Sequence, residues 1–475
     1  MNGKALSLPE ALPTVLARTL PEFRAVIALE RLSGGASQET YKLKIDTTDG
    51  ARQLALRREA GGRPMARTSG QVGLRVEARL IKAAHAAGVP VPEILGEFEP
   101  GDGLGEGFVM TWIDGESLGA RLVRSPELAA VRPRLAFECG QVLARIHAID
   151  PTTSGLSSVL EVRPPVAFVN ATWQHYQALQ SPQPMIDFTA RWLLANLPPA
   201  RSPRLVHGDF RNGNLMVTPR GVVAVLDWEI AHLGDPLRDL GWLCTNSWRF
   251  GNSALPVGGF GEYADLLAGY AAESGQPIDL AELKFWEVFG SFWWAVGCLK
   301  MAEHFRLGPD QTVERPGIGR RSSECQVDCV NLLIPGAVTR VVLNAAHRDD
   351  ALPRLDELVS SVRDYLRADV MAATTGRTSF LGRVAANSLD IVLRDMATGE
   401  QARDAEHERL RRLFNSDAAL NTLRWRLVDG LRTGQLAIEQ PELTIHLRET
   451  VVNEALIDQP TYSGCVTALR NAGYA

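Results

Sequence analysis

Apolar side chains near the C-terminal end of the chain recur at intervals of three and four residues, which is the period of one face of an α-helix. The two clearest runs are Leu355, Leu358, Val362 and Leu366, and then Leu420, Leu423, Leu427 and Leu431. Between these runs we expect a second helix at about 378–397 and a charged third helix at about 400–414, and after them a fifth at about 441–456. Five helices with short polar connections predict a small helical bundle over residues 351–475.

The N-terminal part of the chain shows the two-residue period of β-strands instead. Residues 40–45 alternate between apolar and polar, residues 53–58 form the next short run, and an apolar run at 108–113 ends in a turn signal. A helix is expected at 75–87, between the last two strands. From Leu118 onward the pattern becomes helical, with helices expected at 134–148 and at about 262–274.

Composition leaves the class of protein open but argues against several partners. The 475 residues are 45% apolar and 22% charged, which is ordinary for a globular protein of two or three domains. A formal net charge of -5 gives no reason to expect a nucleic-acid partner. The most apolar window, Phe289 to Met301, is interrupted by Lys300 and is too short to span a bilayer. The six cysteines are scattered and the N-terminus has no signal pattern, so we expect reduced thiols in a cytoplasmic protein.

The residues that could carry chemistry gather in the stretch 205–243. Asp209 and Asn214 lie five positions apart in a loop rich in asparagine and glycine. A short buried strand at 222–226 then delivers a second carboxylate at Asp227. Phosphoryl transfer needs such a set, because one group must orient and deprotonate a hydroxyl while oxygen ligands hold Mg²⁺ on the phosphates.

The same residues also have a purely structural explanation. Asp, Asn and Gly are common turn residues, so a hairpin with an Asp-capped exit would contain the same letters. The kinase-type site is favoured by His207, two residues before Asp209, and by the strand that ends in Asp227-Trp228.

Three motifs together resemble the aminoglycoside phosphotransferase-like kinases, which are relatives of choline kinases and, more remotely, of protein kinases. The motifs are His207-Gly208-Asp209 through Asn214, Leu226-Asp227-Trp228-Glu229, and Gly234-Asp235-Pro236 with Asp239. The branch most similar is the one that also occurs fused to acyl-CoA dehydrogenases, and the tail resembles an uncharacterised helical domain sometimes appended to these kinases. The resemblance implies an α+β, bilobal protein kinase-like fold with an antiparallel-sheet lobe at 1–113, a mainly helical lobe at 114–345 and the C-terminal bundle at 351–475.

The resemblance also implies the roles of the central residues. Asp209 is the catalytic base, and Asn214 and Asp227 hold Mg²⁺. The implied cofactor is ATP with Mg²⁺, bound between the two lobes.

Three further residues of this stretch are expected to support the site. Asp235 is a natural N-cap with Pro236 at the first helical position, so Asp235 and Asp239 are given mainly structural roles. His207 is expected to fix the loop through backbone hydrogen bonds rather than to shuttle protons.

A glycine-rich turn before the first strand is the candidate phosphate cover. Gly34, Gly35 and Ser37 form a turn whose backbone N–H groups could approach phosphates. A Gly-Gly hairpin is commonly only a hairpin, so this interpretation depends on the resemblance to the family's nucleotide-covering loop.

The strand at 53–58 carries Arg57 where the wider family has a lysine on the nucleotide phosphates. Arginine is permanently charged and forks onto phosphate, so it can replace the charge but not the point geometry of lysine. A solvated arginine on an edge strand is the structural alternative. By the resemblance, Glu77 pairs with Arg57, backbone atoms near Trp112 address adenine, and Met110 backs the adenine pocket.

Two functional hypotheses follow. The first is ATP- and Mg²⁺-dependent transfer of the γ-phosphate to a hydroxyl of a small molecule. Family analogy favours a hydroxy acid or hydroxyacyl-CoA over an aminoglycoside, whose several amines would need an acidic cleft. The second is a nucleotide-binding pseudokinase with a regulatory role, suggested by the missing lysine. Apart from the substrate, the expected partner is a second copy bound through the C-terminal helical domain.

Overall fold

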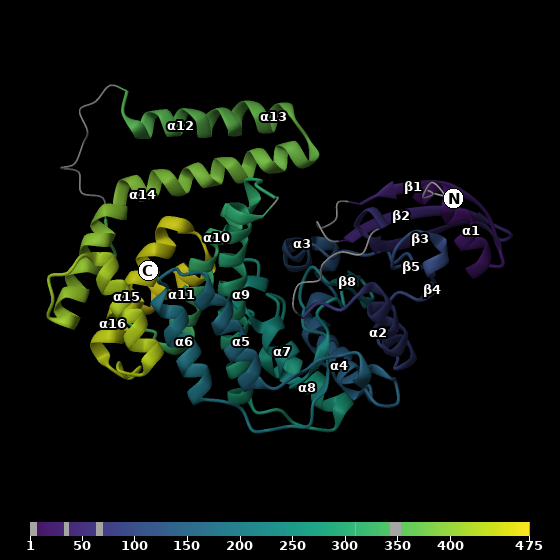
Figure 1. Ribbon diagram of the computed structural model, residues 1–475, viewed down its shortest axis with the longest axis horizontal. Coiled ribbons are helices and arrows are strands. Elements are labelled where there is room, and N and C mark those ends of the chain that lie inside the picture. The colour runs from purple at the N-terminus through teal and green to yellow at the C-terminus, as the bar shows by residue number, and fades with distance from the viewer. Residues whose placement is uncertain (1–6, 33–37, 63–69, 309, 343–352, 475) are drawn as a thin grey trace. The chain divides into compact units, whose positions relative to one another are not determined.

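Figure 1 shows the computed structural model, which describes residues 7–32, 38–62, 70–308, 310–342 and 353–474. The described Cα positions divide into two compact units, and each is described by itself. The first unit comprises residues 1–164, 199–244 and 248–286, and the second comprises residues 165–198, 245–247 and 287–475.

The first unit opens with a five-stranded antiparallel sheet in the order β1-β2-β3-β5-β4. The strands are β1 (Phe23–Arg31), β2 (Gln38–Thr47), β3 (Gly50–Glu59), β4 (Ile94–Glu97) and β5 (Gly107–Thr111). Alternate side chains of β2, including Leu43 and Ile45, are buried in one cluster with Leu12 and Leu16 of helix α1 (Leu8–Thr19). The three predicted strands are present as β2, β3 and β5, and the sheet has two additional strands, β1 and β4, that we did not predict.

The rest of this unit is helical, with short strands that carry the loops of the site. Its helices are α2 (Leu74–Ala86), α3 (Gly119–Arg124), α4 (Arg132–Ala148), α7 (Leu237–Cys244) and α8 (Tyr263–Ser274). Its short strands are β6 (Val162–Arg163), β7 (Arg204–Val206), β8 (Leu215–Thr218), β9 (Gly221–Val225) and β10 (His232–Gly234). The strand β10 pairs with β6 and β7, while β8 and β9 form a separate hairpin.

All of the regular secondary structure in the described residues of the second unit is helical. It contains α5 (Pro165–Ala178), α6 (Pro184–Ala195), most of α9 (Leu280–Leu307), α10 (Glu314–Arg320), α11 (Ser322–Leu333), α12 (Leu355–Tyr365), α13 (Met371–Ala373), α14 (Gly376–Phe414), α15 (Leu420–Thr433), α16 (Pro441–Asp458) and α17 (Ser463–Asn471). Its core joins the leucines of α15 and α16 to Met185 and Phe188 of α6 and to Val327 and Val330 of α11.

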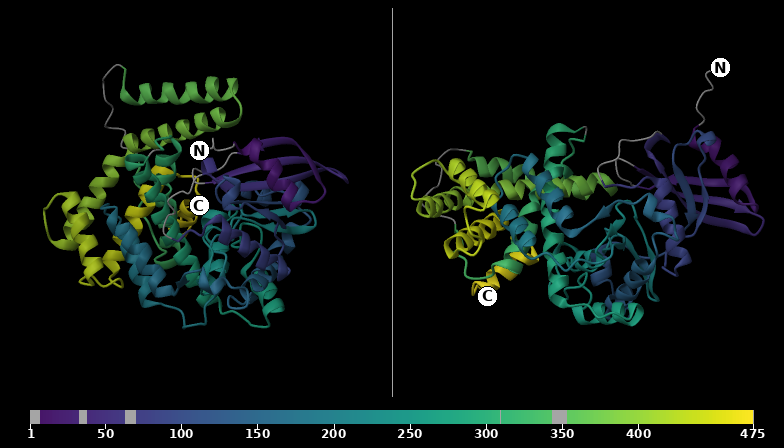
Figure 2. Two further views of the ribbon diagram at one scale, coloured as in Figure 1. Left: turned by 45° about the vertical axis from the view of Figure 1, so that its right-hand side comes forward. Right: turned by 60° about the horizontal axis from the view of Figure 1, so that its bottom comes forward.

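The tail differs from the sequence prediction in one long element. The helices expected at 378–397 and 400–414 are a single helix, α14, which runs antiparallel to α12 as a hairpin in Figure 1 and in the left view of Figure 2. A single Gly399 is not enough to end a helix when both flanking segments pack, because its cost there is only about 1 kcal/mol. The helix α17 was not predicted.

None of the helices in the described ranges combines the length and the apolar character that crossing a membrane requires.

Candidate functional site

The loop between β7 and β8 is anchored by a buried carboxylate. Asp239, in the first turn of α7, accepts hydrogen bonds from the backbone N–H groups of His207 and Gly208, each at 2.8 Å. Gly208 has φ 86°, and a Cβ there would meet the carbonyl oxygen of Ile230 at 2.7 Å, so only glycine suits this turn. The anchor fixes the direction in which Asp209, the next residue, leaves the strand.

A third donor to Asp239 comes from a helix distant in the sequence. His147 of α4 lies with Nε2 3.1 Å from Asp239 Oδ2, and its Nδ1 lies 3.1 Å from the hydroxyl of Tyr270. Burial alone would raise the pKa of Asp239, but the hydrogen bonds that it accepts, from His147 and from the Gly208 N–H among others, outweigh it and lower the pKa to about 2. The carboxylate is thus held ionised inside the protein.

Asp209 is held by three side chains. Its Oδ1 accepts from Trp242 Nε1 at 2.8 Å and from Arg211 Nε at 2.9 Å, and its Oδ2 accepts from Asn214 Nδ2 at 2.6 Å. The side chain of Asp209 remains 16% exposed. One lone pair of Oδ2 is therefore still free to accept a proton from a hydroxyl.

The β8–β9 hairpin brings Asn214 and Asp227 to the same end. Leu215 pairs with Val225 in its register, so the residue before β8 faces the residue after β9, and Leu226 N–H donates to the carbonyl oxygen of Asn214 at 2.8 Å. Asp227 has φ 66°, an uncommon conformation for a residue other than glycine. Its side chain is 35% exposed, so this carboxylate can be approached from solvent.

His207 ties the two acidic segments together through its ring. Its Nε2 lies 3.1 Å from the carbonyl oxygen of Leu226, and its Nδ1 accepts from the backbone N–H of Asp209 at 3.2 Å. These two contacts require the neutral ring with the proton on Nε2, and burial lowers the pKa of His207 in the same sense. The geometry is that of a structural support.

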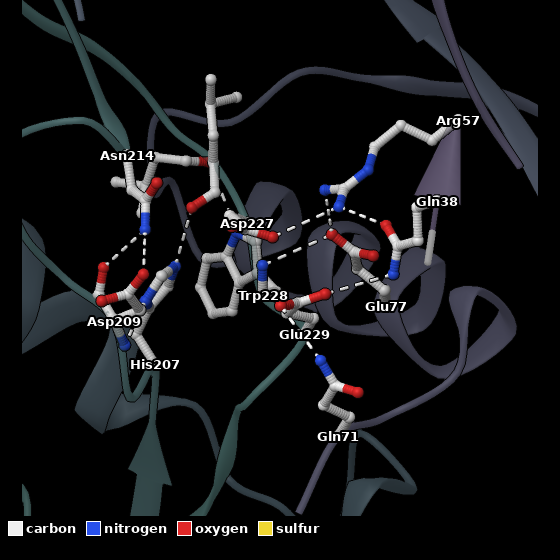
Figure 3. Close-up of polar contacts among 12 residues, drawn as sticks. Gln38, Arg57, Gln71, Glu77, His207, Asp209, Asn214, Asp227, Trp228 and Glu229 are labelled. Carbon is white, nitrogen blue, oxygen red and sulfur yellow. Dashed lines mark hydrogen bonds and ion pairs between the residues drawn. The ribbon is translucent and has the colours of Figure 1, made fainter. Parts of the chain in front are cut away.

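Arg57 of β3 reaches across to the second acidic segment, as Figure 3 shows. Its Nη1 lies 2.6 Å from Glu77 Oε1, and its Nη2 lies 3.2 Å from Asp227 Oδ1 and also donates to Gln38 Oε1. The structure thus places the predicted pair of Arg57 and Glu77 in contact. Burial would lower the pKa of Arg57, but the carboxylates of Glu77 and Asp227 outweigh it and raise the pKa.

Glu77 is the deepest member of this cluster. It is fully buried on α2, where it also accepts from the backbone N–H of Trp228 at 3.4 Å. Burial raises the pKa of Glu77 to about 7, although the guanidinium of Arg57 opposes the rise.

Glu229 completes the cluster, although its role was not foreseen from the sequence. Its carboxylate accepts from Gln38 Nε2 at 3.2 Å and from Gln71 Nε2 at 3.3 Å (Figure 3). Its backbone oxygen accepts from Val72 N–H at 2.7 Å. Burial and the nearby Asp227 raise the pKa of Glu229. In the sequence, only the position of Glu229 in the Asp-Trp-Glu motif, two residues after Asp227, could have indicated that it lies at the site.

The remaining predicted residues lie apart from the Arg57 cluster. Met110 of β5 is 8% exposed and pairs with Ala55 of β3. Trp112 follows β5, its indole N–H donates to Asp114 at 2.8 Å, and the ammonium of Lys42 lies 4.6 Å from the ring centre. Gly34, Gly35 and Ser37 lie outside the described residues.

Asp235 lies two residues before α7, which begins at Leu237 rather than at Pro236 as predicted. Its Oδ1 accepts from the backbone N–H of Leu237, the first residue of α7, at 3.0 Å. Sequence reasoning missed His147, Trp242 and Arg211. Arg211 lies inside the motif from His207 to Asn214, but only the fold shows that it contacts Asp209. His147 and Trp242 belong to none of the three motifs.

A β-rich lobe, a helical region and a loop acid joined to an amide and a second acid together define a kinase-like phosphotransferase. Residues 28–275 match the phosphotransferase enzyme family (APH). Because that match spans more than half of the 475 residues, the chain belongs to this family. Residues 372–462 match a domain of unknown function, DUF6285.

Relatives support the branch that the motifs suggested. Acyl-CoA dehydrogenase family member 10 of Mus musculus is 32% identical over 218 residues, which are 44% of this chain and 19% of that protein. Acyl-CoA dehydrogenase family member 11 of Homo sapiens is 25% identical over 389 residues, which are 76% of this chain and 47% of that protein. The chain therefore spans less than half the length of these relatives, and the predicted resemblance is confirmed.

A solved structure supports the fold. A putative aminoglycoside phosphotransferase from Ralstonia eutropha JMP134 is similar with a TM-score of 0.56 and 22% identity, over 68% of this chain and 97% of that chain. Similarity at this level concerns the fold, and it confirms the predicted α+β, kinase-like class.

Proposed function

We propose that this protein transfers the γ-phosphate of ATP to a hydroxyl group of a small molecule, with Mg²⁺ as the metal. The observation that carries the proposal is the convergence of Asp209, Asn214 and Asp227 on one end of the β8–β9 hairpin. Family membership supports the reaction class, and the arrangement of donors supports the residue roles.

In this proposal Asp209 is the catalytic base. Three donors from Trp242, Arg211 and Asn214 fix its carboxylate, so the rotamer is set before the substrate arrives. A substrate hydroxyl beside Oδ2 would be oriented by it and would pass its proton to it as the phosphoryl group is transferred.

The oxygen donors at this end fit Mg²⁺. Asn214 gives its Nδ2 to Asp209, so its Oδ1 is the atom left for a cation, and the carboxylate of Asp227 is partly exposed beside it. Mg²⁺ needs only one or two protein ligands when phosphate oxygens and water supply the others. When bound, the metal would neutralise charge on the phosphates.

We propose that Arg57, held by Glu77, contacts the nucleotide phosphates in place of the family's lysine. As the resemblance implies, Gly34, Gly35 and Ser37 would cover these phosphates, and Met110 and Trp112 would line the adenine end. The buried Arg57–Glu77 pair supports this role because it fixes a cation beside Asp227.

For the acceptor we propose a hydroxy acid or hydroxyacyl-CoA. Support comes from the relatives, which are named as acyl-CoA dehydrogenase family members. We also propose a cytoplasmic location, where the six cysteines would stay reduced. A panel of hydroxy acids, their CoA thioesters and aminoglycosides, assayed for ATP-dependent phosphorylation by mass spectrometry, tests the choice, and turnover of aminoglycosides alone would contradict it.

The test of the reaction itself is Asp209→Asn. This change keeps the size of the side chain but removes the base, so we expect kcat to fall by about 10³-fold while nucleotide affinity changes little. Steady-state kinetics and calorimetric nucleotide binding check the two parts. Undiminished turnover would remove Asp209 from the reaction.

One observation favours a second candidate, a nucleotide-binding pseudokinase with a regulatory role. Arg57, in the position of the lysine, already contacts Glu77, Gln38 and Asp227. Nucleotide binding without turnover of any member of the acceptor panel would support this candidate over the kinase.

We also propose that the C-terminal helical domain binds a second copy of the chain. Leu355, Leu358 and Val362 lie on one face of α12 and are 65%, 51% and 52% exposed, which is unusual for an apolar stripe. Light scattering of the full chain tests this: we expect a dimer, and Leu358→Asp with Val362→Asp should give monomers. An unchanged mass would contradict the proposal.

A further inference from the structure

An arginine at position 57 needs hydrogen-bond acceptors in fixed directions, which a lysine in the same position would not need. A guanidinium carries five N–H donors in a rigid plane, whereas an ammonium carries three that rotate freely. An arginine here therefore needs an additional acceptor at a fixed angle. In this structure Glu77 takes one edge of the guanidinium, and Gln38 and Asp227 share Nη2.

The amide of Gln38 can be oriented in only one way. Arg57 has no acceptor, so the side that faces it must be Oε1, and the amide nitrogen then points to Glu229. Glu229 accepts that N–H at 3.2 Å and is itself held by Gln71 at 3.3 Å (Figure 3). A chain of contacts therefore runs from Gln71 through Glu229 and Gln38 to Arg57.

The third acceptor of Arg57, Asp227, is the carboxylate proposed to hold Mg²⁺. The contact between Arg57 Nη2 and Asp227 Oδ1 at 3.2 Å is the longest contact of the guanidinium to a side-chain acceptor, and it competes with a cation for the same oxygen. If Gln38 did not hold Nη2, the guanidinium could turn fully onto Asp227. A tighter ion pair there would oppose metal and phosphate binding.

We propose that Gln38 and Glu229 are positioning residues for Arg57: Glu229 orients the Gln38 amide, and that amide holds the guanidinium between Glu77 and Asp227 so that Asp227 stays available to Mg²⁺. This inference rests on the proposed kinase function. It adds two residues outside the predicted site, and it explains how an arginine can serve where the family has a lysine.

Charge repulsion alone and the positioning role predict opposite effects of Glu229→Leu on nucleotide affinity. Glu229→Leu removes a negative charge beside the phosphates, which by charge alone should tighten nucleotide binding. If Glu229 instead orients Gln38, the same change should weaken binding. The sign of the effect therefore separates positioning from general repulsion.

The experiment measures the affinity of the full chain for a fluorescent ATP analogue, with and without Mg²⁺, for Gln38→Leu, Glu229→Leu and the double variant. We expect each single variant to weaken binding in Mg²⁺ by about tenfold, as for the loss of one charge-assisted hydrogen bond. The loss should be smaller without Mg²⁺, because the effect passes through Asp227. The double variant should bind like either single variant, because both act on one chain of contacts.

Several outcomes would overturn the inference. Additive losses in the double variant would mean that Gln38 and Glu229 act separately, for example with Glu229 as a direct metal ligand. Tighter binding by Glu229→Leu would leave only a charge effect, and equal losses with and without Mg²⁺ would indicate general damage to the site. If the unaltered chain does not bind nucleotide, the proposed function itself fails. If the unaltered chain binds nucleotide and the variants bind it equally well, only the positioning role of Gln38 and Glu229 fails.

Two controls keep the test interpretable. Gln53→Leu makes the same change at an exposed position of β3 and should leave nucleotide affinity unaltered. If the leucine variants fail to fold, Gln38→Asn and Glu229→Asp shorten each side chain by one methylene and break the same contact. Unchanged affinity in both of these variants would overturn the proposal.

Discussion

At the residue scale, Asp239 fixes the position of the loop between β7 and β8. It accepts from two backbone N–H groups and from His147, so both of its oxygens face donors. Its sequence context marked it as structural, but the number and identity of its partners came only from the fold. Asp239 therefore fixes the loop between β7 and β8, although it has no direct role in the proposed reaction.

The low pKa of Asp239 makes a testable statement about pH and stability. The folded pKa of about 2 is below the ordinary 3.8, so the ionised carboxylate contributes stability that is present above pH 4 and is lost as the pH falls from 4 to 2. The size of this contribution is on the order of 2 kcal/mol. Asp239→Asn would turn an N–H donor toward another donor, so we expect it to lower the free energy of unfolding by about 2–3 kcal/mol at pH 7.

Denaturant unfolding at several pH values checks this prediction. The difference between the unaltered chain and Asp239→Asn should shrink as the pH falls below 4. Asp404→Asn, on the exposed side of α14, is the matched control and should change stability by less than about 0.5 kcal/mol. A difference that is independent of pH would show that Asp239 does not act through its charge.

At the scale of elements, the crossing of α4 and α8 sets the position of His147. Both helices were predicted from the sequence, at 134–148 and 262–274, but their contact was not. Gly140 and Gly269 lie at the crossing, and a Cβ on Gly269 would overlap the carbonyl oxygen of Phe137. The two backbones therefore approach more closely than side chains would allow.

We predict that Gly269→Ala destabilises the protein by about 1–3 kcal/mol, because backbone cannot give way as a flexible side chain would. The change should also weaken the contact of Tyr270 with His147, so activity should fall together with stability. Thermal unfolding and steady-state rates measure the two effects. Gly101→Ala is the control, since a Cβ there meets nothing within 4 Å, and equal effects of the two changes would refute the close approach.

At the scale of the whole molecule, the C-terminal helices α15 and α16 share a hydrophobic core with α6 and α11, which lie much earlier in the sequence. Leu427 and Leu431 of α15 are buried together with Met185 and Phe188 of α6. A buried ion pair between Asp187 and Arg432, at 2.9 Å, joins the same two helices. The boundaries predicted at 113, 345 and 351 remain predictions, but the tail cannot be removed without exposing apolar side chains of α6.

The prediction at this scale compares two leucines of the tail. Leu427 is fully buried, so Leu427→Ala should lower the free energy of unfolding by about 2–5 kcal/mol. Leu355 is 65% exposed, so Leu355→Ala should change that free energy by less than about 0.5 kcal/mol in the monomer. Urea unfolding of both variants measures the difference. Similar values would mean that the tail core contributes little to stability.

The sequence by itself determined the kinds of element and the kinds of group. The two-residue period of the strands and the three- and four-residue intervals of the helices predicted the sheet and most of the helices. The spacing of Asp209, Asn214 and Asp227 predicted a phosphoryl-transfer site. These features are local, because a strand, a loop and a capped helix are each specified by neighbouring residues. The prediction of two helices in place of α14 was wrong for the same reason. Gly399 lies between the two predicted helices, and the packing that keeps α14 continuous there involves residues distant in the sequence.

Only the tertiary structure decided which groups meet. Arg57 and Asp227 are 170 positions apart, and Gln38 and Glu229 are 191 apart. A contact of that kind depends on the register of β2 with β3 and on how α2 and the β8–β9 hairpin are placed, and no local pattern records it. The sequence thus supplied the acids, the amide and the arginine, while folding selected Gln38, Glu229 and His147 as the residues that hold them.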